Sequence, residues 1–397
     1  MADILVLNAG SSSLKYQLFR GGAPVDGGIV ERIGEPDGEA SDHGAAVGRV
    51  LDRLGGHSIE AVGHRVVHGG TRFRAPVVVD DAVLDAIRQL SALAPLHNPL
   101  GVAGIEAARS ALPGVPQVAV FDTAFHATLP AAAATYALDR EVAQRYGIRR
   151  YGFHGISVGW VVAGTARLLG RPVAALNLVV LHLGNGASAT AVAGGRSVET
   201  SMGLTPLEGL VMGTRTGDLD PAVAFHLGRA GLAPDDIEDL YQYRSGLAGL
   251  CGDNDLRQVA ARDAAGDPAA RLALDVYCHR IRKYVGAYHA VLGRLDAITF
   301  TAGVGEHSAL VRQRSLAGLE PLGIAVDPDR NADKRRLADP AQVLAHDKRR
   351  LADPAQVLAH DGQPARVVSP DGARVTVCVV PTDEERAIAE EVARLLG

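Results

Sequence analysis

Apolar and polar stretches alternate along the first third of the chain in a way that predicts both strands and helices. Short apolar runs bounded by polar or glycine residues predict strands at Ile4–Leu7, Leu14–Phe19, Ala61–Val67 and Gln117–Phe121. Apolar residues spaced three and four apart predict helices at Ala82–Leu93 and Val102–Leu112. Alternating strands and helices indicate an α/β fold.

The same pattern begins again near residue 150. A predicted helix at Val158–Leu169 precedes the strand NLVVLHLG, a polar glycine turn and the hairpin-like segment ASATAVAGG. A mostly helical stretch covers about 220 to 294 and leads into the strand AITFTAG. The chain closes with the strand RVTVCVVP and the amphipathic helix DEERAIAEEVARLL.

Two segments share one plan of apolar strand, small polar glycine turn and second strand. They are LVLNAGSSSLKYQLF near the start of the first half and VVLHLGNGASATAVAGG near the start of the second. The occurrence of this strand–turn–strand segment in both halves of the chain predicts two related lobes. Backbone N–H groups in such turns bind anions, so the pair also predicts a polyphosphate site. Two unrelated hairpins are the alternative, and spacing alone does not exclude it.

Composition narrows the class of protein. The chain has 397 residues, enough for two or three domains, with 47% hydrophobic and 21% charged residues. A net charge of -5 without a long basic tract argues against a nucleic-acid partner. No apolar run approaches membrane-spanning length, no signal peptide is evident, and the three cysteines form no disulfide or metal pattern. We therefore expect a soluble, cytoplasmic protein with no membrane partner.

Nucleotide motifs are present but individually weak. No P-loop pattern occurs. GNGASA from Gly184 fits a dinucleotide fingerprint, yet a β-like segment follows where that fingerprint needs a helix. GVGEHS from Gly303 lies between a predicted strand and helix, where a phosphate or ribose can bind. A tight turn that needs glycine for steric reasons remains the alternative.

Two charged residues end predicted strands. Arg65 lies near the end of an apolar strand, and a charge in that environment needs an anionic partner. Asp122 directly follows another apolar strand, at the end where open α/β sheets present ligand-binding groups. Asp122 is equally well placed to cap the following turn, and the sequence does not decide between the two roles.

Three further features are ambiguous. His154 lies between Phe153 and Gly155, where a packed core histidine is more common than a catalyst. The glycine-rich stretch at 201–221 contains Arg215 and is less polar than an ordinary surface loop. Thr382 and Glu385 have capping-box spacing at the start of the last helix, which leaves Glu384 free for another role.

Taken together, these motifs resemble the acetate kinase (acetokinase) family. NAGSSSLKYQLF, GHRVVHGG, LAPLHNP, VFDTAFH, RRYGFHG, HLGNGAS, TSMGLTPLEGLVMGTRTGDLDP, FTAGVGE and VPTDEE occur in the family's order. They extend from residue 4 to about 390, nearly the whole chain. The first hairpin and the stretch at 201–221 are the most specific of them.

The resemblance implies an α/β fold of two lobes, of the kind shared by acetate and sugar kinases, Hsp70 and actin (ribonuclease H-like), with the nucleotide in the inter-lobe cleft. It implies an N-terminal lobe at 1–150, completed by a C-terminal helix at about 383–397, and a nucleotide-binding lobe at 151–382. The implied reaction is reversible transfer of the γ-phosphoryl group of ATP to acetate, with Mg²⁺ (or Mn²⁺), in a cytoplasmic homodimer.

The resemblance also assigns residues to roles by motif. The metal would be served by Asn8 and Glu384. The nucleotide would be bound by Ser11, Ser13, Lys15, His182, Leu183, Gly184, Asn185, Gly186, Asp255, Leu256, Arg257, Gly303, Val304, Gly305, Glu306 and His307. The acyl group would contact Arg65, Val67, Leu96, Phe153 and Pro206. The catalytic set would be Arg65, Asp122, His154 and Arg215.

Elementary chemistry refines these roles. Acetate resembles the side chains of Asp and Glu, whose pKa values are about 3.9 and 4.3, so it is ionised at neutral pH and needs no general base. Asp122 is then better placed to orient Mg²⁺-bound water or substrate than to accept a proton. The harder step brings one anion up to another, and Arg65 and Arg215 would neutralise that charge. His154 would add a hydrogen bond to a phosphoryl oxygen.

The chain departs from the family pattern in three places. Ile156, Ser157 and Val158 stand where most relatives have Thr-Ser-His, and His307 replaces the usual Asn after GVGE. KRRLADPAQVLAHD at 334–347 is repeated without change at 348–361. Two copies are too few for a solenoid, so we interpret them as a local duplication within a loop.

Alternatives remain at this point. A propionate or butyrate kinase would differ mainly in the size of the acyl pocket, where one methylene is worth only about 1–3 kcal/mol. An ATP-driven conformational protein of the Hsp70 or actin type is less consistent with the arginines. An NAD-dependent oxidoreductase is a distant third.

Overall fold

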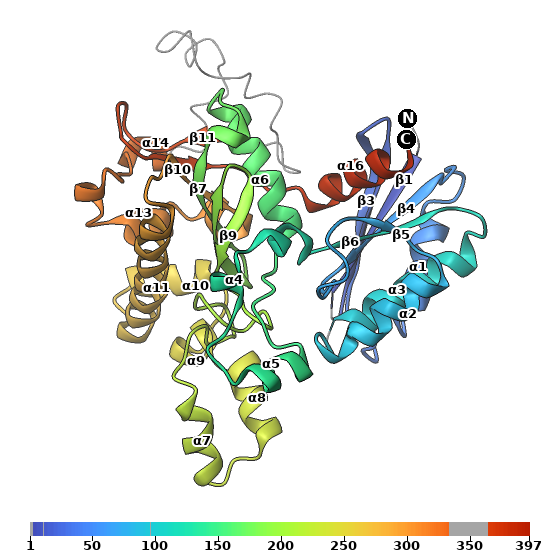
Figure 1. Ribbon diagram of the computed structural model, residues 1–397, viewed down its shortest axis with the longest axis horizontal. Coiled ribbons are helices and arrows are strands. Elements are labelled where there is room, and N and C mark those ends of the chain that lie inside the picture. Colours follow the sequence, from blue (N-terminus) through green and yellow to red (C-terminus); the bar gives the residue numbers. More distant parts are fainter. Residues whose placement is uncertain (1–2, 11, 96, 333–363) are drawn as a thin grey trace. The chain divides into compact units, whose positions relative to one another are not determined.

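The chain folds into two compact units. The computed structural model describes residues 3–10, 12–95, 97–332 and 364–397. Unit 1 comprises Met1–Ala127, Phe153–Ser157 and Asp383–Gly397, and unit 2 comprises Thr128–Gly152 and Val158–Thr382 (Figure 1). The duplicated segment at 334–361 lies outside the described residues.

Unit 1 is built on a six-stranded mixed sheet of order β3-β2-β1-β4-β6-β5. Its strands are β1 (Asp3–Ala9), β2 (Leu14–Arg20), β3 (Ala23–Val30), β4 (Ala61–Val66), β5 (Val77–Val78) and β6 (Gln117–Phe121). Its helices are α1 (His43–Arg53), α2 (Asp81–Gln89), α3 (Asn98–Ala111) and α16 (Glu384–Leu396). In Figure 1, α1, α2 and α3 gather on one side of the sheet and α16 on the other.

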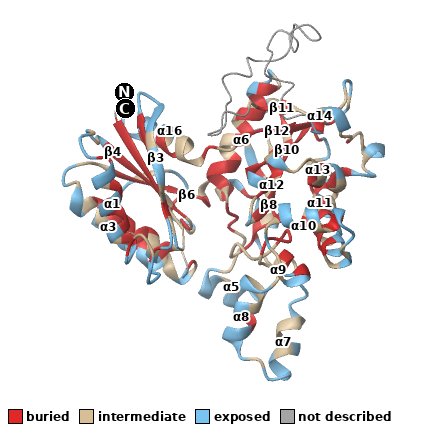
Figure 2. Cartoon of the chain, turned by 180° about the vertical axis from the view of Figure 1, so that it is seen from behind, coloured by how far each residue is buried: buried red, intermediate tan, exposed pale blue. Residues whose placement is uncertain are grey.

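Helices on both faces explain why the central strands are apolar throughout. Successive side chains of a strand point to opposite faces. Leu5 of β1 belongs to one core cluster with Val47 of α1. Its neighbours Ile4 and Val6 belong to another, with Ile388 of α16. A strand buried on both faces reads as a continuous apolar run, as the sequence of β1 does (Figure 2).

Gly63 sets how closely α16 approaches β4. A Cβ atom at Gly63 would lie 2.7 Å from Cγ2 of Ile388 and 2.9 Å from Cγ2 of Val392. No side chain fits at those distances without moving the helix. The absence of a Cβ therefore lets the last helix of the chain lie directly on the sheet.

Unit 2 repeats the architecture of unit 1. Its strands are β7 (Asn177–Leu183), β8 (Ala187–Ala193), β9 (Arg196–Thr200), β10 (Ala297–Thr301), β11 (Arg366–Val367) and β12 (Thr376–Val379), in the order β11-β12-β10-β7-β8-β9. In each sheet, two antiparallel pairings join the first three strands, two parallel pairings follow, and an antiparallel edge strand closes the sheet. The prediction of two related lobes, each with an early hairpin, is confirmed.

Unit 2 is rich in helices, of which some lie on its sheet and others lie away from it (Figure 1). They are α4 (Ala131–Ala134), α5 (Arg140–Tyr146), α7 (Ala222–Arg229), α8 (Pro234–Tyr243), α9 (Gly246–Cys251), α10 (Leu256–Ala264), α11 (Pro268–Leu292), α12 (Ala302–His307), α13 (Ala309–Leu316) and α14 (Pro328–Ala332). Helix α6 (Gly155–Leu168) begins in unit 1 and continues in unit 2. None of the helices in the described part of the chain combines the length and apolar character that a membrane crossing requires.

The division between the units differs from the expected boundary at 150. Residues 128–152 belong to unit 2. Arg150 explains part of this, because its Nη2 lies 2.6 Å from Oε1 of Glu208, and the Tyr151 amide donates to the Gly203 carbonyl at 3.0 Å. Such long-range contacts leave no periodic signal in the sequence.

We expect Gly63→Ala to lower the free energy of unfolding by about 1–3 kcal/mol, because the added methyl group forces α16 off the sheet. Urea unfolding of the purified variant measures this. Gly48→Ala is the matched control, since Gly48 is exposed within α1 and its Cβ would meet nothing within 4 Å. That change removes backbone freedom and should stabilise the protein slightly. Equal effects of the two substitutions would contradict the close packing at Gly63.

Candidate active site

Three parallel strands of unit 1 end at polar residues. Asn8 lies near the end of β1, Arg65 near the end of β4, and Asp122 directly follows β6. The pairs β1–β4 and β4–β6 are parallel, so these ends share one edge of the sheet. That edge is where open α/β sheets present groups to a ligand.

Arg65 is the centre of this group. Its Nη2 lies 2.5 Å from Oδ2 of Asp122, and its Nη1 donates to Oδ1 of Asn8 at 3.1 Å. Its Nε lies 3.6 Å from Oε2 of Glu384. Burial alone would lower the pKa of Arg65, but Asp122, Glu384 and Glu385 outweigh burial and raise the pKa. Arg65 therefore stays charged at every physiological pH.

Asp122 pairs with Arg65 in this group. The Asp122 side chain is only 1% exposed, and its carboxylate accepts hydrogen bonds from Nε and Nη2 of Arg65. Asp122 is thus part of the charged group at the strand edge.

The predicted capping box at the start of α16 was wrong. Asp383 is the N-cap residue, and its Oδ1 accepts from the Arg386 amide at 3.0 Å. Glu385 is therefore not needed for the cap, and its Oε1 accepts from Nδ2 of Asn8 at 3.1 Å. A helix N-terminus favours acidic side chains, which stabilises both Glu384 and Glu385 at this position. Glu385 joins the candidate site as a residue that the sequence analysis missed.

The oxygen atoms at this edge are of the kind that Mg²⁺ prefers. Three carboxylates, those of Asp122, Glu384 and Glu385, surround one arginine and leave a net negative charge. Mg²⁺ is commonly bound by one or two carboxylates together with waters and substrate phosphates. No ready-made cage of three or more His, Cys, Asp or Glu ligands occurs among the described residues. The donor set therefore fits an ion that arrives with a phosphate ligand.

The segment that carries Phe153 and His154 is tied to β6 in unit 1. The Gly155 amide donates to the Asp122 carbonyl at 2.9 Å, and a Cβ at Gly155 would lie 2.2 Å from that oxygen. Nε2 of His126 lies 2.9 Å from the Phe153 carbonyl oxygen. His154 has a φ of 60°, which is uncommon for any residue but glycine. Backbone held in this way is typical of functional positions.

The predicted acyl-pocket residues are divided among parts of the chain. Val67 follows β4 and Phe153 precedes α6, so both belong to unit 1. Phe153 is 2% exposed and makes an edge contact with the His68 ring, with 5.6 Å between the ring centroids. Pro206 belongs to unit 2, and Leu96 lies outside the described residues.

Each glycine turn is closed by one internal backbone hydrogen bond, although the two bonds span different numbers of residues. In the first, the Gly10 amide donates to the Ser13 carbonyl at 2.7 Å, and Nε2 of His43 lies 2.8 Å from the Gly10 carbonyl oxygen. In the second, the Gly184 amide donates to the Gly186 carbonyl at 3.0 Å. Among the described residues, no hydrogen bond or ion pair involves the side chains of Ser13 and Lys15, whereas Ser11 lies outside those residues.

A cavity of about 730 Å³ in unit 2 is lined by half of the predicted nucleotide residues. Its lining includes Gly184, Asn185, Asp255, Leu256, Arg257, Gly303, Val304 and His307. This volume is in the usual range for a ligand pocket. Hydrogen bonds from Arg257 lower the pKa of Asp255 to about 2, and the same carboxylate caps α10.

Of the predicted nucleotide residues that belong to unit 2, five do not line this cavity: His182, Leu183, Gly186, Gly305 and Glu306. The carboxylate of Glu306 instead accepts from the Ala302 amide at 2.8 Å and from the Thr382 amide at 3.0 Å. Ala302 has a φ of 63°, so this contact holds strained backbone at the start of α12. Glu306 therefore supports the start of α12.

Arg215 lies on a loop that packs against the second glycine turn. The Gly213 amide donates to the Asn185 carbonyl at 2.9 Å, and a Cβ at Gly213 would lie 1.9 Å from Oδ1 of Asn185. Nη1 of Arg215 donates to the Pro206 carbonyl at 3.3 Å. Burial lowers the pKa of Arg215, and no carboxylate of the described residues forms an ion pair with it. This guanidinium is therefore available to an anionic ligand.

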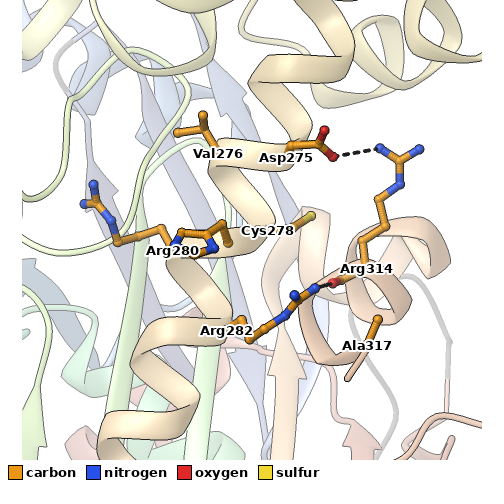
Figure 3. A pocket seen from close by; sticks show the side chains of 8 residues that line it. Asp275, Val276, Cys278, Arg280, Arg282, Arg314 and Ala317 are labelled. Carbon is orange, nitrogen blue, oxygen red and sulfur yellow. Dashed lines mark hydrogen bonds and ion pairs between the residues drawn. The ribbon is translucent and has the colours of Figure 1, made fainter. Parts of the chain in front are cut away.

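A second cavity of about 610 Å³ lies between α11 and α13 (Figure 3). Its arginines are already engaged within the protein. Arg314 pairs with Asp263 at 2.6 Å and with Asp275 at 3.7 Å, while Arg282 donates to backbone carbonyls at the end of α13. This cavity offers no free charge comparable to that of Arg215.

We expect His126→Gln to weaken the loss of stability at acid pH. Burial lowers the pKa of both His126 and His64 to about 4, so the unfolded chain takes up protons before the folded protein does. The free energy of unfolding should then fall from about pH 6.5 to about pH 4, by up to about 1.4 kcal/mol per pH unit for each histidine. Urea unfolding across this pH range measures the slope.

Glutamine keeps an N–H donor for the Phe153 carbonyl but does not titrate. His226→Gln is the control, because His226 is exposed on α7. The control should follow the wild-type curve. A pH dependence of His126→Gln identical to that of the wild type would contradict the assignment of His126 as a buried neutral imidazole.

Comparisons with known proteins agree with the geometry. The family model of the acetokinase family matches residues 3–352. The chain is 52% identical to an acetate kinase of Streptomyces griseus, over 99% of this chain and 96% of the relative, and 53% identical to one of Clavibacter michiganensis, over 98% of each. The crystal structure of Porphyromonas gingivalis acetate kinase covers 100% of both chains with a TM-score of 0.87 and 36% identity. A propionate kinase of Francisella tularensis gives a TM-score of 0.86 and 36% identity over 98% and 99% of the chains. The chain belongs to the acetokinase family.

Proposed function

We propose that the protein catalyses reversible transfer of the γ-phosphoryl group of ATP to acetate, giving acetyl phosphate and ADP. The observation that carries this proposal is Arg215, a half-buried guanidinium without a carboxylate partner in the described residues. Its loop packs on the turn at Gly184–Gly186, which contributes to the 730 Å³ cavity. A cation in this position is suited to a transferring phosphoryl group.

The roles of the two arginines follow from charge. Acetate is ionised at neutral pH, so the chemical difficulty is the repulsion between the carboxylate and the phosphates. An arginine that stabilises the transition state can be worth ~10³–10⁵ in rate, and we assign that role to Arg215. We assign acetate binding to Arg65 and a hydrogen bond to a phosphoryl oxygen to His154.

Asp122 has no proton to accept in this reaction. Together with Asn8, Glu384 and Glu385 it would hold Mg²⁺, or Mn²⁺ in its place. A bound divalent ion would neutralise phosphate charge during transfer. Asp122 and Asn8 also fix the guanidinium of Arg65, so the same side chains would orient both the cation and the carboxylate substrate.

The nucleoside would occupy the cavity lined by Asp255, Leu256, Arg257, Gly303, Val304 and His307. The phosphates would meet Ser11, Ser13 and Lys15 of the first turn and residues 182–186 of the second. The acyl methyl group would contact Val67, Leu96, Phe153 and Pro206. We keep a homodimer, a cytoplasmic location and a place in acetyl-CoA biosynthesis as predictions.

One assay tests the proposed function. The purified protein is incubated with ATP, hydroxylamine and acetate, propionate or butyrate, and acyl hydroxamate is measured with Mg²⁺ and with chelator. Acetate should give the highest kcat/KM, and the chelator should abolish product. A higher kcat/KM with propionate would favour the propionate kinase alternative, and no hydroxamate from any acid would overturn the proposal.

We expect Arg215→Ala to lower kcat by orders of magnitude while leaving ATP affinity within a few-fold of the wild type. Arg215 does not line the nucleotide cavity, so its loss should affect the transition state more than the bound nucleotide. Isothermal titration with ATP and the hydroxamate assay separate the two effects. Arg244→Ala, on an exposed ion pair with Asp239 in the same unit, is the control. A near-normal kcat for Arg215→Ala would remove this residue from the catalytic set.

A further inference from the structure

The loop at 201–221 lies between β9 and α7 and contains no helix or strand. Long ordered loops without secondary structure depend on specific contacts for their position, because no backbone ladder holds them. This loop carries both Pro206 and Arg215. The question is which side chains hold it.

One set of contacts surrounds the first half of the loop. Nη2 of Arg150 lies 2.6 Å from Oε1 of Glu208, and Nη1 of Arg150 donates to the carbonyls of Ser201 and Met202, each at 3.2 Å. The guanidinium carbon lies 5.4 Å from the ring centroid of Tyr136. Arg150 thus binds the start of the loop and the carboxylate of Glu208 at the same time.

Tyr136 completes this arrangement. Its hydroxyl donates to Oε2 of Glu208 and accepts from the Leu204 amide at 3.1 Å. A Cβ at Gly203 would lie 1.9 Å from Oε2 of Glu208 and 2.0 Å from the Tyr136 hydroxyl oxygen. The loop therefore wraps around the Glu208 carboxylate so closely that only glycine fits at position 203.

These contacts are partly shielded from solvent. The Arg150 side chain is 16% exposed and that of Glu208 is 33% exposed. Burial alone would lower the pKa of Arg150, but attraction to Glu208 raises it, so Arg150 stays charged. A partly shielded, multiply hydrogen-bonded pair holds its geometry better than a fully exposed pair does.

Arg150, Glu208 and Tyr136 together form a clamp on the first half of the loop. This clamp lies close in sequence to a backbone carbonyl that contacts Arg215. Glu208 is two residues from Pro206, whose carbonyl accepts from Nη1 of Arg215 at 3.3 Å. The later half of the loop is held separately, since the Gly209 amide donates to Oδ1 of Asp218 at 3.0 Å and Tyr284 donates to the same carboxylate. Loss of the Glu208 contacts would release the Pro206 carbonyl while the rest of the loop stays in place.

We infer that Arg150, Glu208 and Tyr136 are positioning residues that orient Arg215 through the carbonyl of Pro206, and that they control the rate of phosphoryl transfer without touching substrate. This inference rests on the proposed function of Arg215. A displacement of about 1 Å at a catalytic group can cost 10²-fold in rate, so loosening the clamp should be visible in kcat.

Glu208→Gln tests this, because it keeps the shape of the side chain and removes its charge. We expect kcat for acetyl phosphate formation to fall about tenfold or more, with KM for ATP changed less than about twofold. Asp239→Asn is the matched control, since it makes the same change in the exposed pair with Arg244. The control should leave kcat, KM and Tm unchanged. A normal kcat for Glu208→Gln would overturn the inference.

A double-mutant cycle with Arg215→Lys separates positioning from general destabilisation. If Glu208 acts through Arg215, Glu208→Gln should lower kcat much less in the Arg215→Lys background than in the wild type. Equal loss in both backgrounds would show that Glu208 acts independently of Arg215 and would overturn the inference. Tyr136→Phe removes one hydroxyl and serves as a milder variant should Glu208→Gln fail to fold, with a several-fold loss of kcat expected.

Hydrogen exchange provides a readout independent of activity. Amides of residues 202–205 should exchange faster in Glu208→Gln and Tyr136→Phe than in the wild type, whereas those around Asp218 should not change. Unchanged exchange at 202–205 would refute the clamp itself. If the wild-type protein forms no acyl phosphate, the proposed function fails, yet the exchange result still decides whether the clamp exists.

Discussion

A guanidinium that is mostly withdrawn from solvent must be surrounded by acceptors, and the organisation of unit 1 depends on how Arg65, whose side chain is 20% exposed, meets this requirement. Its partners come from β1, from the end of β6 and from the first turn of α16. The last helix of the chain must therefore return to the sheet formed by the first strands. Gly63 permits that return, because it leaves room for Ile388 and Val392 against β4. The charge of Arg65 therefore requires the packing of α16 on the sheet, because that packing brings the first turn of α16 to the guanidinium.

The two units share one architecture but differ in the groups that lie beside their glycine turns. Both sheets have the same strand order, and both place a glycine turn, closed by an internal backbone hydrogen bond, between their first two strands. In unit 1 the strand ends beside that turn carry Arg65 and carboxylates. In unit 2 the turn at Gly184–Gly186 borders a cavity, and the Arg215 loop packs on it. The same sheet architecture thus carries an acidic edge centred on an arginine in unit 1 and a cavity in unit 2.

Local patterns predicted much of this fold because they report on burial along a single element. The hairpins, β6 and the helix over the C-terminal residues all follow from periodicity. The cap of α16 did not, since Thr382 and Asp383 are both good N-cap residues and only the backbone geometry selects Asp383. That one-residue shift concealed Glu385. Likewise, GVGEHS indicated a ligand turn, yet the sequence could not show that Glu306 turns back toward Ala302.

The residues that no pattern revealed are those that hold backbone at a distance in sequence. Arg150 reaches Glu208, His126 reaches the Phe153 carbonyl, and Glu306 reaches the Ala302 amide. Two of these contacts lie beside His154 and Ala302, which have φ values of 60° and 63°. Such backbone is costly for residues other than glycine and persists only where neighbouring contacts enforce it. Because the supporting side chains bind main-chain atoms, their effect on a ligand is indirect. They fix the backbone that carries candidate site residues, and for this reason a search for reactive residue types alone overlooks them.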